Sequence, residues 1–117
     1  MGLFEELKAL GVNIDVGLDR LGGNQALYER LLGSFLKTMD THAVTPDFDE
    51  EDLTDAIEKT HAIKGTSGNL SITPVYEAYT DIVALLRAGQ PAQAKEVLEK
   101  VMPVQEEIID CIRRYSK

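Results

Sequence analysis

Apolar residues recur at spacings of three and four along almost the entire chain of 117 residues, and no stretch alternates apolar and polar residues as a half-buried strand would. The pattern is clearest in the stretch 25–40, whose apolar residues are Leu27, Leu31, Leu32, Phe35, Leu36 and Met39. This periodicity predicts an all-α protein. A chain of this length can bury its own core, so we expect one helical domain over residues 1–117.

Turn and capping residues divide the chain into one short helix and four longer ones. The short helix is predicted at 3–10, and Asp15 is expected to cap a brief helical turn after it. The four longer helices are predicted at residues 25–40, 50–70, 74–88 and 91–114. Because short connections join the last three, we expect an up-down antiparallel four-helix bundle with a short N-terminal helix.

Individual residues mark the expected ends of the longer helices. Asn24 and Asp49 are predicted N-caps, and Thr73 is expected to cap a helix that carries Pro74 in its first turn. Pro103 lies inside the last predicted helix and is expected to kink or split it, because proline lacks the backbone donor of an internal helical position.

The balance of charge restricts the class of partner. The chain carries 12 basic and 20 acidic side chains, a net charge of −8, which disfavours binding to nucleic acids and to anionic membranes. No apolar run reaches the roughly 20 residues that span a bilayer, and the N-terminal residues do not resemble a signal peptide, so we expect a cytoplasmic protein. The single cysteine, Cys111, cannot form an internal disulfide and is expected in the core.

The stretch THAIKGTSGNL, residues 60–70, is unusual for a helix because it contains two glycines. Each glycine costs a helix about 1 kcal/mol relative to alanine. A helical wheel at about 100° per residue predicts the core face of this helix. Its members are Leu53, Ala56, Thr60, Ile63, Ser67 and Leu70.

The histidine and both glycines lie away from that face. With Leu53 at zero, His61 falls at about 80°, and Gly65 and Gly68 fall at about 120° and about 60°. Lys64, at about 20°, is close enough along the helix to share space with His61. A neutral imidazole is a nucleophile, phosphorus is a suitable target, and a lysine can offset the charge of an attached phosphoryl group. Helical glycines also permit close packing of helices, and an exposed histidine is often merely solvated, so the pattern alone leaves both interpretations open.

The segment HAIKGTSGNL resembles the H-x-x-K-G signature of histidine phosphotransfer (HPt) domains, including the small residues that often follow it. Upstream, GVNIDVGLDRLGGNQALYERLLGSFL is similar to the N-terminal segment of these domains, and LLRAGQPAQAKEVLEKV resembles their final hairpin. The resemblance covers about residues 11–115, in the expected order.

By position, the resemblance implies that His61 accepts a phosphoryl group, that Lys64 lies beside this group, and that Gly65 clears room for a partner. It also implies that Gly68 and Ser67 contribute small residues to the same docking surface.

Ile57, one turn before the histidine, is a candidate apolar docking contact by position. The chain departs from the pattern of the family at Ser71, Pro74, Tyr76 and Tyr79. These differences leave open which residue of 74–88 borders the site.

HPt domains take a phosphoryl group from a receiver-domain phosphoaspartate and pass it to another receiver aspartate. The resemblance therefore implies a monomeric phosphoryl carrier, not an enzyme, whose partners are response-regulator receivers or a hybrid histidine kinase. No cofactor is expected, since magnesium and the aspartate pocket belong to the receiver, and no G-x-x-x-x-G-K-[ST] phosphate loop is present.

Other classes of function are less well supported by the residues. The main alternative is an HPt-shaped interaction module that binds receiver or kinase domains without phosphorylation. A kinase fragment would label itself with ATP alone, which we do not expect. His42 is expected as a solvated linker residue, and no clustered ligands indicate a metal site. A hydrolase built on Ser67 or Cys111 lacks a suitably placed second histidine.

Overall fold

A computed structural model describes residues 2–115, and this part of the chain contains six helices and no strand. The prediction of an all-α protein is therefore confirmed. The helices are α1 (Leu3–Ala9), α2 (Ile14–Arg20), α3 (Gln25–His42), α4 (Thr54–Asn69), α5 (Thr73–Arg87) and α6 (Pro91–Tyr115).

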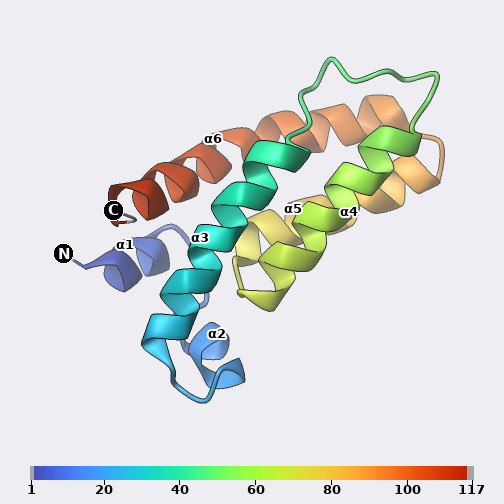
Figure 1. Cartoon of the computed structure of the whole chain (residues 1–117). Helices are drawn as coiled ribbons and strands as arrows, with labels where there is room; N and C mark the ends of the chain where they lie inside the picture. Colours follow the sequence, from blue (N-terminus) through green and yellow to red (C-terminus); the bar gives the residue numbers. More distant parts are fainter. Residues whose placement is uncertain (1, 116–117) are drawn as a thin grey trace.

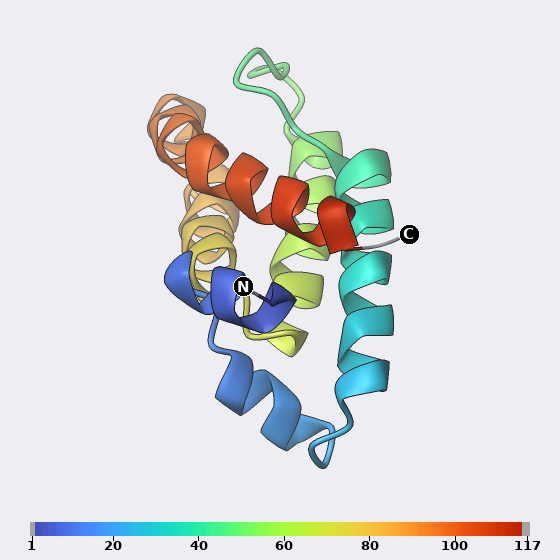
Figure 2. The same ribbon diagram turned by 90° about the vertical axis from the view of Figure 1, so that its left-hand side faces the viewer.

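The longer helices pack in sequence order, and the most extensive contacts join α4 to α5 and α5 to α6. Figure 1 shows α4 running back along α3, and α5 returning along α4. In Figure 2, α6 crosses α3 and α1 lies beneath the C-terminal half of α6. The short helix α2 contacts both α1 and α3, which places it near the end of α4 that leads into α5.

One apolar core cluster draws on all six helices. Its two largest polar-tipped members have partners: the Tyr28 hydroxyl donates to the Leu70 carbonyl at 2.6 Å, and the Tyr79 hydroxyl donates to Gln105 Oε1 at 2.6 Å. Cys111 is fully buried, as predicted. Burial raises the pKa of the Cys111 thiol, so the thiolate is disfavoured.

Three predicted N-caps, Asp15, Asp49 and Thr73, are wrong. The side chain that caps α2 belongs to Asn13, which accepts from the Val16 amide at 3.3 Å, and not to Asp15. The helix α4 begins at Thr54, not at residue 50, because Asp49 accepts from the Glu51 amide at 2.9 Å and closes a turn before the helix. Asn24 caps α3 as predicted and accepts from the Leu27 amide at 3.0 Å.

The remaining differences concern His42 and Thr73, which lie at helix ends. His42 is the last residue of α3, not a linker residue. Thr73 is the first residue of α5 and not its cap, because Ile72 holds the N-cap position and the Thr73 hydroxyl donates to the Ser71 carbonyl. The helix α6 runs through Pro103 without being split. Pro103 is exposed, so water can satisfy the carbonyl that the proline leaves without a partner.

The segment between α3 and α4 is attached to α6 by Lys95. The ammonium of Lys95 pairs with Glu50 at 3.0 Å and lies 4.9 Å from the centroid of the Phe48 ring. These contacts hold the acidic linker at the end of the molecule where α3 ends and α4 begins.

Candidate functional site

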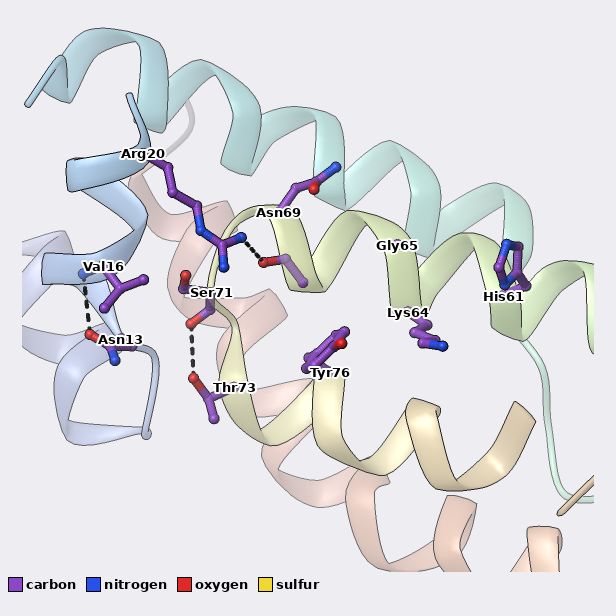
Figure 3. Close-up of a pocket in the computed structure, with 11 residues that line it drawn as sticks. Asn13, Val16, Arg20, His61, Lys64, Gly65, Asn69, Ser71, Thr73 and Tyr76 are labelled. Carbon is purple, nitrogen blue, oxygen red and sulfur yellow. Dashed lines mark hydrogen bonds between the residues drawn. The ribbon is translucent and has the colours of Figure 1, made fainter. Parts of the chain in front are cut away.

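A surface pocket of about 470 Å³ runs along α4 and is closed at one end by α2 and by the first turn of α5 (Figure 3). Four of the predicted site residues line it: His61, Lys64, Gly65 and Gly68. Seven lining residues were not predicted, namely Asn13, Val16, Arg20, Asn69, Ser71, Thr73 and Tyr76.

His61 is exposed at the end of the pocket farthest from α2 (Figure 3). Its neighbours Thr60 and Ile63 are both 0% exposed and hold the opposite face of α4 in the core. The predicted orientation of this helix is therefore confirmed. The imidazole of His61 makes no hydrogen bond to any residue between 2 and 115, so neither ring nitrogen has a competing partner in this part of the chain.

The two helical glycines have different surroundings. A Cβ atom added at Gly65 would meet no atom within 4 Å, so packing inside the chain does not require a glycine there. A Cβ atom added at Gly68 would lie 2.7 Å from Cε1 of Tyr76, which is too close. Helix packing therefore explains Gly68, whereas the open space at Gly65 is available to a molecule that approaches His61.

Two predicted docking residues, Ser67 and Ile57, do not line the pocket. Ser67 is 0% exposed, and its hydroxyl donates to the Ile63 carbonyl at 2.7 Å, so a partner cannot touch it. Ile57 is half-buried and packs against the core, so only part of its side chain is available for docking. Gly68 lines the pocket, but Tyr76 packs against it and covers it in part.

The charged groups around the pocket are all basic. Arg20 lines it at the α2 end and Lys64 lines it near His61, and its lining includes no aspartate or glutamate from residues 2–115. Neither cation forms an ion pair with a carboxylate in this described part of the chain. In a protein with a net charge of −8, the pocket is therefore a local concentration of basic side chains.

Hydrogen bonds fix the end of α4 that forms the floor of the pocket. Arg20 Nη1 donates to the Gly68 carbonyl at 2.8 Å, and the Asn13 amide donates to the Ser71 carbonyl at 2.9 Å. Together with the bond from Tyr28 to Leu70, they join α2 and α3 to the turn between α4 and α5.

Local sequence patterns could not identify Arg20 or Tyr76 as pocket residues. Arg20 lies 48 positions before the carbonyl that it binds, and only the tertiary fold brings the two together. The only indication in the sequence was that Tyr76 is aromatic where the family pattern has a small or aliphatic residue. In the structure this large ring packs against the helical glycine Gly68.

No group of three or more potential His, Cys, Asp or Glu ligands in residues 2–115 is arranged to hold a metal ion. His42 is half-buried at the end of α3, where Thr41 Oγ1 lies 2.7 Å from its Nδ1, and it does not line the pocket. No described helix is both long and apolar enough to cross a membrane.

Comparisons with protein-family models, with curated proteins and with solved structures find no match for this chain. The function must therefore be inferred from the geometry of the site and from the residues that carry the resemblance.

Proposed function

We propose that this protein is a histidine phosphotransfer domain in which His61 accepts a phosphoryl group from a receiver phosphoaspartate and passes it to another receiver aspartate. The proposal includes a cytoplasmic, monomeric carrier that is not itself an enzyme. It also includes an up-down four-helix arrangement of α3 to α6, which the alternating directions of α3, α4 and α5 support.

The observation that carries the proposal is the combination of an exposed His61 with empty space over Gly65. A glycine in the middle of a helix costs about 1 kcal/mol relative to alanine, and no packing contact in the described chain requires it here. An approaching receiver would require that space, because its aspartate must reach the imidazole. Lys64 lies within one turn of His61 and has no competing carboxylate, so its ammonium is available to a phosphoryl oxygen.

The proposed step is an in-line displacement at phosphorus. A lone pair of a neutral ring nitrogen of His61 forms the new N–P bond while the P–O bond to the receiver aspartate breaks, and the carboxylate leaves with the bonding electrons. The resulting imidazolium loses its other ring proton to solvent. In the return step the ring takes up a proton from solvent, a carboxylate oxygen of a second aspartate forms a P–O bond, and the N–P bond breaks to release neutral His61. Positioning and charge neutralisation supply most of the catalysis in this kind of transfer.

A phosphorylated receiver domain tests the proposal. A panel of purified receivers is labelled with radioactive acetyl phosphate and mixed with wild-type protein, His61→Gln and the matched control His42→Gln. We expect acid-labile label on wild type and on His42→Gln, and none on His61→Gln. Receiver binding without label on any variant would overturn the proposal in favour of a non-phosphorylated interaction module.

A further inference from the structure

The pocket extends well beyond the reach of a phosphoryl group on His61. Arg20 binds the Gly68 carbonyl, seven residues after His61 along α4. At 1.5 Å per residue, the two ends of the pocket are about 10 Å apart. Figure 3 shows Arg20 at one end and His61 at the other, with Gly65 between them. Arg20 is therefore too far away to neutralise a phosphoryl group on His61.

The charge of Arg20 remains available to a visiting molecule. Its one recorded partner is the neutral Gly68 carbonyl, which takes a hydrogen bond from Nη1. Arg20 is exposed, and no carboxylate within residues 2–115 pairs with it. A planar guanidinium has five donors, so several of them can still bind a carboxylate.

Exposed apolar side chains line the same end of the pocket. Of the three large hydrophobic residues that are exposed in the described part of the chain, Val16 at 43% and Tyr76 at 39% both lie here. The Tyr76 ring packs against Gly68, and its exposed part adds apolar surface to this end of the pocket. Tyrosines and arginines are among the residues that contribute most to protein interfaces.

We propose that Arg20, Val16 and Tyr76 form a second contact region for the receiver, separate from the reacting atoms. This inference depends on the proposed phosphotransfer function. The region fits an acidic receiver side chain with an apolar neighbour, about 10 Å from the phosphoaspartate that reaches His61. Arg20 then selects receivers by charge and positions them, and it does not act on the phosphoryl group.

The experiment compares two phosphodonors on the same variants. Phosphoramidate is a small donor that requires no docking, whereas a phosphorylated receiver must dock. The measured quantity is the second-order rate constant for receiver-driven labelling of His61, divided by the rate constant for labelling by phosphoramidate. For Arg20→Gln we expect this ratio to fall about five- to tenfold, and to fall less steeply with added salt than in wild type.

The variants separate charge from structure. Glutamine loses the charge and has a shorter side chain with an amide donor, whereas Arg20→Lys keeps the charge, so the lysine variant should retain most of the ratio. Lys100→Gln removes an exposed charge from α6, which does not line the pocket, and should match wild type. Val16→Ser tests the apolar part of the region independently and should lower the ratio about threefold.

The outcomes distinguish this inference from the proposed function. If receivers label wild type but the ratio and its salt dependence are the same in Arg20→Gln and Val16→Ser, the second contact region is wrong and phosphotransfer stands. If Lys100→Gln lowers the ratio as much as Arg20→Gln, only the net charge of the protein affects the ratio, and the proposal of a second contact region is again overturned. If no receiver labels wild-type protein, both proposals are overturned.

Discussion

Tyr76 packs its ring against the bare backbone of Gly68, so closely that a Cβ atom on that glycine would lie 2.7 Å from Cε1 of the ring. This contact closes the α2 end of the pocket and leaves the tyrosine 39% exposed. One turn earlier, Gly65 has no such neighbour, so two glycines of one helix serve different purposes. The difference can be tested by substitution.

Gly65→Ala should stabilise the protein and slow phosphotransfer. Alanine removes the glycine penalty of about 0.5–1 kcal/mol in a helix, and the added methyl group meets no atom of the chain. The larger Gly65→Leu should keep its helix content but slow transfer from a receiver about a hundredfold, because a misplacement of about 1 Å has that effect. Urea unfolding measures the free energy of unfolding, and rapid-quench labelling measures the rate of phosphotransfer. Transfer at the wild-type rate in Gly65→Leu would show that a receiver does not use this space.

Gly68→Ala should have the opposite effect on stability. The alanine methyl group would force the Tyr76 ring to move, and overpacking of this kind costs about 1–3 kcal/mol. After the helix gain of about 1 kcal/mol, we expect a net loss of about 1 kcal/mol in the free energy of unfolding. In a Tyr76→Ala background, the same change should stabilise by about 0.5–1 kcal/mol. Urea unfolding of wild type, the two single variants and the double variant completes this double-mutant cycle. Equal effects of Gly68→Ala in both backgrounds would contradict the packing contact.

Ser71→Gly should stabilise the turn between α4 and α5. Ser71 has a φ of 57°, in the left-handed region, which costs a residue with a side chain about 1–2 kcal/mol. After the extra chain entropy of glycine, a gain of about 0.5–1 kcal/mol should remain. The matched control, Ser34→Gly, is exposed inside α3 and should instead destabilise by about 0.5 kcal/mol. Thermal unfolding measures both, and a loss of stability in Ser71→Gly would mean that the serine side chain contributes more than the strain removes.

Alkaline pH should weaken the fold through Tyr28. Burial raises the pKa of Tyr28 to about 12, whereas a tyrosine in the unfolded chain titrates near about 10. Between these values the unfolded chain loses the phenolic proton and the native chain keeps it. Stability therefore falls as pH rises through this window, and Tyr28 accounts for a loss of about 2 kcal/mol by pH ~12.

Urea unfolding of wild type and Tyr28→Phe between about pH 8 and about pH 11 checks this expectation. The phenylalanine variant loses the hydrogen bond to the Leu70 carbonyl and should be about 1 kcal/mol less stable at pH 8, but its stability should fall less steeply above about pH 10. Parallel pH profiles for the two proteins would show that Tyr28 does not contribute to the alkaline loss.

Helical periodicity was sufficient to predict the fold class and the orientation of α4. Thr60 and Ser67 are polar, yet the wheel placed them in the core, and both hydroxyls do donate to carbonyls of the preceding turn. The start of α4 could not be predicted in the same way. Aspartates close turns as readily as they cap helices, and Asp49 does the former.

The histidine end of the pocket was accessible to sequence reasoning because His61, Lys64 and Gly65 lie within two turns of one helix. The other end depends on contacts between distant segments. Arg20 and Tyr76 reach Gly68 from α2 and α5, and no local pattern encodes those approaches. The wheel also could not show that only one of the two glycines has free space around it.

The central claim is that His61 carries a phosphoryl group between receivers, and mapping the phosphate through a complete relay tests it most directly. Wild-type protein is labelled by a phosphorylated receiver and purified. One portion is analysed by mass spectrometry with electron-transfer dissociation, and the rest is mixed with a second, unlabelled receiver. We predict one phosphate, located on His61, which then leaves the protein and appears on an aspartate of the second receiver. A phosphate on any other residue, or undiminished labelling of His61→Gln, would contradict the account.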